Sequence, residues 1–144
     1  FLLAGRYSLL EQKSLETFLP RCLKENSSIV LGGPYNSGIL ATGVRKEGVV
    51  PHYNYEPASP SIIKTVDKIE TICEEFNVPL AAAALQFPLA HPSVVSVIPG
   101  LSSANRVKST VDLMNVNIPS EFWVALQNAG ILYPDVPVPT GIAE

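Results

Sequence analysis

Residues 94–106 read VVSVIPGLSSANR, and the other predicted elements of the chain can be placed around this stretch. Its β-branched residues predict a short buried strand that breaks at Pro99-Gly100. Ser102 and Ser103 follow as candidate N-caps of a helix. A strand is thus followed by a tight turn and a helix. The apolar residues of that helix recur at helical spacing: Val107, Val111 and Met114.

This arrangement predicts an anion-binding site. The turn places backbone N–H groups and the positive end of a helix dipole around one point. Arg106 lies early in the helix, so its guanidinium can close over a bound anion. The residues alone therefore predict a phosphate-bearing ligand. The alternative is a plain strand-to-helix turn that carries a surface arginine.

The composition is typical of a globular chain and argues against several classes of partner. Apolar residues make up 47% of the 144 residues, charged residues make up 16%, and the formal net charge is −3. This charge argues against nucleic acid or an anionic membrane surface as the main partner. No apolar run approaches the ~20 residues of a membrane span. Two histidines without a His/Cys/Asp cluster predict no metal site.

The two cysteines and the first residues indicate the compartment and the context of the chain. Cys22 and Cys73 lie on apolar stripes of predicted helices, which predicts buried thiols in a reducing compartment; the alternatives are a disulfide or a catalytic thiol. We therefore expect the cytoplasm. The length fits a single domain over residues 1–144. The opening run FLLAG reads as if it starts inside a strand, so we expect a fragment of a longer protein.

Apolar runs and helical periods alternate along the chain. Helices are predicted after Ser14, Ser59, Pro79, Ser103 and Pro119, with Pro20 bending the first one or marking a late start. Strands separated by helices predict a parallel sheet, and near-continuous apolar runs predict burial on both faces. Three strands make a poor complete sheet but a good part of an eight-stranded α/β barrel. The predicted strands are Phe1–Ala4, Ile29–Leu31 and Val94–Ile98.

Residues 35–60 show no period and predict a long binding loop. His52, Tyr53 and Tyr55 in this loop either line a ligand or pin the loop to the body. His91 is predicted to end a helix and to bond backbone carbonyls rather than to act as a catalytic base.

Four segments together resemble the C-terminal part of an aldo-keto reductase, with most likeness to the branch of L-fucose, D-threo-aldose, L-galactose and pyridoxal dehydrogenases. The resemblance covers essentially the whole chain. It implies the C-terminal part, about strands six to eight and their helices, of a TIM (β/α)8 barrel that binds NAD(P) without a Rossmann domain. Ligands of such barrels sit at the C-terminal ends of the strands. The segments are Ala4–Leu10, Val30–Leu40, Leu85–Pro92, and Ser96–Gly100 with Arg106.

The resemblance also implies cofactor-binding residues. The loop after the second strand resembles the one that runs along the nicotinamide ribose and pyrophosphate, and the turn after Val97 resembles the adenosine-side loop. Arg106 matches the arginine that contacts the adenine and the 2′-phosphate. The implied residues are Gly33, Pro34, Tyr35, Asn36, Ser37 and Gly38 in the first loop, and Ile98, Pro99, Gly100, Leu101 and Ser102 in the second.

The chain departs from the family pattern at several of these positions. Gly100 stands where many members have a lysine that helps select NADP, so NAD and NADP both stay open. Ala4 stands where many have a glutamine to the carboxamide, and Gly32 where many have a tyrosine on the nicotinamide. Ser109 and Thr110 replace the Glu and Asn that often contact adenine.

The resemblance implies a parent oxidoreductase that transfers a hydride between NAD(P) and the carbonyl or lactol carbon of a small sugar or aldehyde. This part would supply cofactor loops, with a substrate rim from Gly38–Pro60 and the tail after Tyr133. The family's catalytic Tyr, Asp, Lys and His come from earlier strands, so we expect no catalytic residue here. The alternatives are a catalytically inactive nucleotide-binding or oligomerising module and a nucleotide-free anion binder.

A sheet of three strands leaves edges and an apolar inner face open. We therefore expect the chain to pair with the missing N-terminal half of the barrel or with itself.

Overall fold

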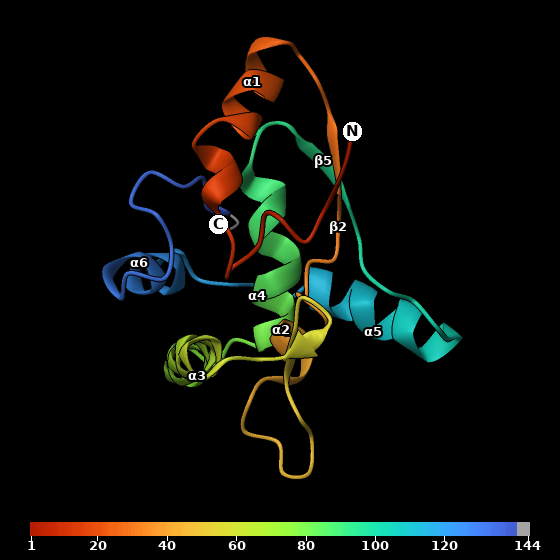
Figure 1. The fold of residues 1–144 in the computed structure, drawn as a ribbon, viewed down its shortest axis with the longest axis vertical. Helices are drawn as coiled ribbons and strands as arrows, with labels where there is room; N and C mark the ends of the chain where they lie inside the picture. The colour runs from red at the N-terminus through yellow and green to blue at the C-terminus, as the bar shows by residue number, and fades with distance from the viewer. Residues whose placement is uncertain (141–144) are drawn as a thin grey trace.

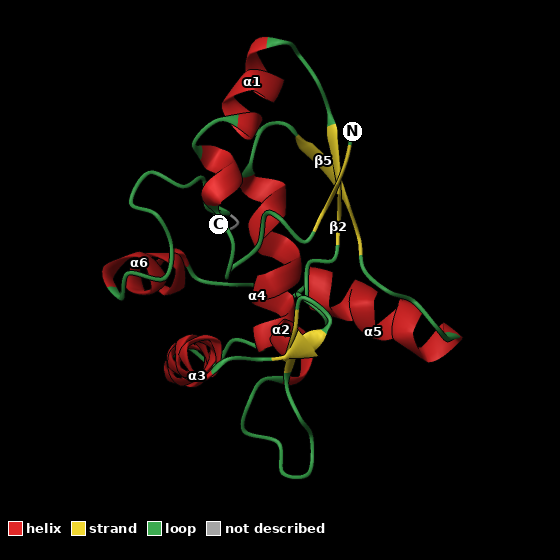
Figure 2. Ribbon diagram, in the orientation of Figure 1, coloured by secondary structure: helices red, strands yellow, loops and turns green. Residues whose placement is uncertain are grey.

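A three-stranded parallel sheet forms the centre of the molecule (Figures 1 and 2). The structure is a computed structural model that describes residues 1–140 of the chain. Strands β1 (Leu2–Ala4), β2 (Ile29–Gly32) and β5 (Val94–Ile98) lie in the order β1-β2-β5. Both neighbouring pairs are parallel. The three predicted strands and the parallel sheet are therefore confirmed.

Four of the five predicted helices begin where local signals predict. The Ser59 hydroxyl accepts the Ile62 N–H at 3.4 Å and caps α3, as predicted. Ser14 does not cap a helix, because its hydroxyl donates to the Arg6 carbonyl. The first helix starts late, so that Pro20 lies in its first turn, where no N–H is needed. The helices are α1 (Phe18–Lys24), α2 (Ile39–Thr42), α3 (Pro60–Glu75), α4 (Leu80–Gln86), α5 (Ala104–Met114) and α6 (Ser120–Asn128), with single 3-10 turns at Lys13–Leu15 and Phe87–Ala90.

An aromatic chain holds the core together. Phe87 is fully buried, and its ring centroid lies 5.2 Å from that of Tyr7 and 6.2 Å from that of Trp123. Trp123 in turn meets Phe122 at 5.0 Å, edge to face. Phe122 reaches Phe76 next to α3 at 6.0 Å. These contacts join the segment after β1 to the end of α4 and to α6, so the core spans segments that are far apart in sequence.

Only one face of the sheet is covered. Ile29 and Leu31 of β2 are fully buried against the core. On the other face, Leu2 is 65% exposed and Ile98 is 50% exposed. Figure 1 shows α1 and α4 together on one side of the strands. The prediction of a sheet buried on both faces was therefore wrong for this chain, because no element within residues 1–140 packs on the second face.

The apolar stripe of α5 is also open to solvent. Ser103, one of the two predicted caps, accepts the Arg106 N–H at 3.3 Å. However, no residue of the helix is buried. Val111, at 54% exposure, illustrates this. The periodicity predicted the helix correctly, but the stripe has no described partner to cover it.

Residues 35–60 contain more structure than their composition predicts. The segment holds α2 and a hairpin of β3 (His52–Tyr53) and β4 (Glu56–Pro57), which Figure 2 shows as a short yellow ribbon beside α2. The prediction of a loop without regular structure was therefore wrong. Each element is too short to show a period, and the hairpin turns on two non-glycine residues with positive φ, Asn54 and Tyr55.

His91 ends the turn after α4, as predicted, but with a different hydrogen bond. Its Nδ1 accepts the Ser93 N–H at 3.1 Å, rather than the ring donating to backbone carbonyls. Burial lowers the pKa of His91 below its usual 6.5. An imidazole nitrogen that accepts a backbone N–H must be unprotonated, so the folded chain favours the neutral ring.

We expect His91 to make the chain less stable in acid. Because its pKa is lower in the folded state, the unfolded state takes up the proton first, so the free energy of unfolding falls as the pH drops below 6.5. His91→Asn removes the titration and keeps an acceptor for the Ser93 N–H. Urea unfolding on both sides of pH 6.5 should then show a flatter pH dependence of the free energy of unfolding than in the wild type. Equal slopes for the wild type and His91→Asn would contradict this.

Cys22 and Cys73 are both free and buried, as predicted. Within residues 1–140, no helix combines the length and the hydropathy needed to cross a bilayer.

Candidate functional site

The two predicted loops lie side by side at one edge of the sheet. Parallel strands end at the same edge, and the register pairs Ala4 with Gly32 and Gly32 with Ile98. The segment Gly33–Gly38, which we call the β2 loop, therefore leaves the sheet next to Ile98–Ser102, the β5 loop. This is the C-terminal edge, where ligands of parallel α/β sheets bind.

The β2 loop begins with a close approach between backbones. The Gly5 N–H donates to the Gly32 carbonyl at 2.9 Å. Gly33 has φ +64°, and a Cβ at this position would lie 3.3 Å from the Gly5 nitrogen. A side chain at Gly33 would therefore be strained by its backbone and crowded by the segment that follows β1.

The end of the β2 loop is unusual in its backbone. Asn36, Ser37 and Gly38 have φ values of 48°, 62° and 95°, so three successive residues are left-handed. Only the third is a glycine, and such a conformation costs free energy for the other two. The Asn36 side chain is buried and its Oδ1 accepts a hydrogen bond from the Ser8 hydroxyl. The loop is thus held from the segment after β1.

The β5 loop is open, and its glycine is not demanded by the backbone. A Cβ on Gly100 would meet nothing, and Gly100 does not have a positive φ. The turn at Pro99-Gly100 therefore does not depend on a glycine. Of the predicted residues, Gly33, Ser37, Ile98, Gly100, Leu101, Ser102 and Arg106 are exposed, Tyr35, Gly38 and Pro99 are half-buried, and Pro34 and Asn36 are buried.

Tyr35 lies in the β2 loop, and Arg106 follows the β5 loop in the first turn of α5. Burial raises the pKa of the Tyr35 phenol, and the nearby charge of Arg106 partly opposes that rise. Both ion pairs found within residues 1–140 belong to Arg45, so the exposed Arg106 has no carboxylate partner in that range. A free guanidinium next to the N-terminus of an eleven-residue helix is suited to an anion.

The β3–β4 hairpin and the tail both form hydrogen bonds to the segment Ser8–Gln12, which lies close to the β2 loop. The Tyr53 hydroxyl donates to Glu11 at 3.2 Å, so Tyr53 pins the hairpin to the body. Tyr55 differs, because its side chain is 94% exposed while its N–H donates to the Ser37 hydroxyl at 3.0 Å. Of the tail proposed for the substrate rim, residues 141–144 lie outside the described residues.

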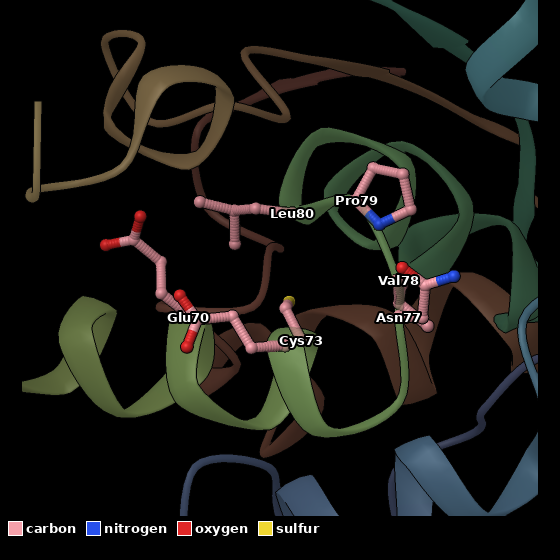
Figure 3. Close-up of a pocket in the computed structure, with 7 residues that line it drawn as sticks. Glu70, Cys73, Asn77, Val78, Pro79 and Leu80 are labelled. Atoms are coloured by element: carbon pink, nitrogen blue, oxygen red, sulfur yellow. The ribbon is translucent and has the colours of Figure 1, made fainter.

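A surface pocket between α3 and α4 contains none of the predicted site residues (Figure 3). Its carboxylates already have partners, since Glu70 accepts the Val44 N–H at 3.0 Å and Glu74 pairs with Arg45 at 2.6 Å. Burial raises the pKa of the Cys73 thiol to about 12, which keeps it protonated and unreactive. The two carboxylates therefore anchor residues 43–45 to α3, and the pocket shows no sign of a reactive centre.

Sequence reasoning missed Ser8 and Gln12. Both are buried polar side chains that bond the β2 loop or the tail. No local signal could identify them, because their partners lie 28 and 121 residues away in the sequence.

Residues 2–131 match the model of the aldo/keto reductase family. Over 131 residues, or 91% of the chain, it is 42% identical to a pyridoxal 4-dehydrogenase of Microbacterium luteolum and 34% identical to a D-threo-aldose 1-dehydrogenase of a Pseudomonas species. These alignments cover 37% and 39% of the two relatives, so the chain spans less than half of their length.

Two solved structures show the same fold. An aldo-keto reductase of Bacillus halodurans in its holo form matches with a TM-score of 0.63 and 26% identity, over 88% of this chain and 41% of that one. A glycerol dehydrogenase of Gluconobacter oxydans matches with a TM-score of 0.67 and 18% identity, over 99% and 45%. The sheet and its helices are thus the C-terminal part of a (β/α)8 barrel, which confirms the expected fold class.

Proposed function

Since this chain belongs to the aldo/keto reductase family, we propose that it is part of an oxidoreductase that transfers a hydride between NAD(P) and the carbonyl or lactol carbon of a small aldose or aldehyde. The names of its relatives, a pyridoxal and an aldose dehydrogenase, support this substrate class. Residues 1–144 would form one partial barrel domain. The free, buried cysteines support a reducing compartment, for which we propose the cytoplasm.

The role proposed for this part is to hold the cofactor. The observation that carries it is the exposed guanidinium of Arg106, which has no carboxylate partner within residues 1–140 and lies in the first turn of α5, directly after the β5 loop. These residues fit a dinucleotide, because its phosphates need cations and N–H groups. Bound there, the nicotinamide cofactor would supply or accept the hydride.

Each loop would bind a different portion of the cofactor. Arg106 and the N-terminus of α5 bind and orient the adenosine phosphate end, through charge and N–H groups. The β2 loop binds the ribose and pyrophosphate side with its left-handed backbone and the Ser37 hydroxyl. The backbone N–H of Tyr55 donates to the Ser37 hydroxyl, and the exposed Tyr55 ring would cover that side of the bound cofactor and exclude water there. The catalytic acid and base are assigned to earlier strands, outside this chain.

Whether the cofactor is NAD or NADP is left to the binding test, because Gly100 replaces the family's selective lysine. Titrating the purified chain with each cofactor, followed by calorimetry, should give saturable binding at one site. The absence of binding by either nucleotide would refute the cofactor role. Turnover of an aldose by this chain alone would refute the assignment of catalysis to other strands.

A second candidate function is an inactive module that associates with another copy. The uncovered face of the sheet favours it, since Leu2 and Ile98 are large apolar side chains in water. The same face would be covered by the missing half of the barrel in a complete protein.

We expect Leu2→Asp to abolish self-association of the isolated chain. The carboxylate would be buried without a partner if two uncovered faces met, which disfavours the dimer. Sedimentation velocity over a concentration series should show association of the wild type and a monomer for the variant. Val124→Asp on the exposed side of α6 is the matched control. If Leu2→Asp associates as the wild type does, the sheet face is not the contact.

A further inference from the structure

A buried serine connects the segment after β1 to the β2 loop. Ser8 is fully buried, and its hydroxyl donates to Oδ1 of Asn36 while accepting the Leu10 N–H at 3.2 Å. Asn36 is itself only 4% exposed. The Ser8 hydroxyl thus acts as a donor and as an acceptor. Its hydrogen bond to Asn36 is therefore directional, and burial shields it from water.

A buried glutamine supports that serine and reaches the tail. The Gln12 amide nitrogen donates to the carbonyls of Ser8 at 3.1 Å and Leu9 at 2.9 Å. Its carbonyl oxygen accepts the Tyr133 N–H at 3.1 Å. Gln12 thus fixes the backbone that carries Ser8 and, with the same side chain, the backbone at the start of the tail.

The β2 loop needs such support because its backbone is strained. Asn36 and Ser37 both have positive φ, in the left-handed region that favours glycine. A conformation of this kind persists when surrounding contacts determine it. The Ser8 hydroxyl supplies that contact, because without it the buried Asn36 amide oxygen loses its partner.

We propose that Ser8 and Gln12 are positioning residues of the cofactor site. Ser8 holds the β2 loop in its left-handed form, and Gln12 links that form to the tail at Tyr133. This inference rests on the proposed function, since it assumes that the β2 loop binds the dinucleotide. This coupling acts in both directions. A ligand that stabilises the left-handed β2 loop therefore also stabilises the hydrogen bond from the Tyr133 N–H to Gln12.

The test compares Ser8→Ala with Asn36→Gly and with the double variant. Ser8→Ala is expected to weaken dinucleotide binding about tenfold, since the loop is no longer preorganised. Asn36→Gly makes the left-handed backbone accessible without the serine. Adding Ser8→Ala to Asn36→Gly should therefore weaken dinucleotide binding little further. The two changes would then not be additive, whereas a general loss of stability would affect binding in both backgrounds. Ser14→Ala, which removes a serine bonded elsewhere, is the control.

Hydrogen exchange gives a readout that does not depend on binding. The N–H of Gly38 should exchange faster in Ser8→Ala. The N–H of Tyr133 should exchange faster in Gln12→Glu, because the carboxylate cannot make either of the two bonds that the amide nitrogen donates to the Ser8 and Leu9 carbonyls. Saturating NADP should slow exchange at Tyr133 in the wild type. Should Ser8→Ala fail to fold, exchange at Tyr133 in Gln12→Glu, with and without saturating NADP, tests the link between the β2 loop and the tail.

The outcomes separate the two proposals. A wild type that binds neither NAD nor NADP refutes the cofactor role, and unchanged exchange at Gly38 in Ser8→Ala then refutes the positioning role as well. A wild type that binds, with Ser8→Ala binding equally well, refutes the positioning role alone.

Discussion

Arg106→Ala is expected to weaken binding of NADP to this chain by about 10- to 100-fold. A hydrogen bond to a charged group contributes about 1.5–3 kcal/mol, and each 1.4 kcal/mol is about tenfold in affinity. Arg106 is exposed and free of ion pairs within residues 1–140, so its whole charge faces the ligand. Calorimetric titration of both proteins measures the difference.

Matched variants separate charge from geometry in this prediction. Arg106→Lys keeps the charge but not the planar fork, so its affinity should fall between the two. Arg21→Ala on α1 removes an equally exposed arginine and should leave the affinity unchanged. If the wild type and Arg106→Ala bind NADP with the same affinity, Arg106 is a surface arginine without a role in cofactor binding. A larger loss for NADP than for NAD would identify the 2′-phosphate as its contact.

Phe87→Ala is expected to unfold the chain or to lower its free energy of unfolding by about 3–5 kcal/mol. The ring is fully buried between those of Tyr7 and Trp123, so truncation leaves a cavity at the centre of the aromatic chain. A domain is stable by only about 5–15 kcal/mol, and here one sheet face is uncovered. Urea unfolding followed by circular dichroism measures the loss.

The control for Phe87 is another phenylalanine in a different environment. Phe1→Ala removes a ring that is largely exposed and should change the free energy of unfolding by less than about 0.5 kcal/mol. Similar losses at the two positions would mean that the aromatic chain does not carry the stability of the core.

Local signals predicted the elements that have a clear period or cap. The apolar runs at β1, β2 and β5, and Ser59 before α3, are each contained within a few neighbouring residues. The hairpin at residues 52–57 was missed because its strands have two residues each and its turn lacks glycine. The exposure of α5 could not be read from its period, because a stripe indicates which side is apolar, not whether a partner covers it.

The residues alone predicted the strands, their parallel pairing, and the meeting of the β2 and β5 loops at one edge. That edge follows from the topology, since parallel strands all end on the same side. Whether these loops bind a nucleotide stays a prediction. Three features depend on the packing of the whole chain: Asn36 turns inward onto Ser8, Gln12 bonds the tail, and one sheet face is open. Periods and caps are encoded within a few residues, whereas these bonds join residues 28 and 121 positions apart and exist only once the chain has packed.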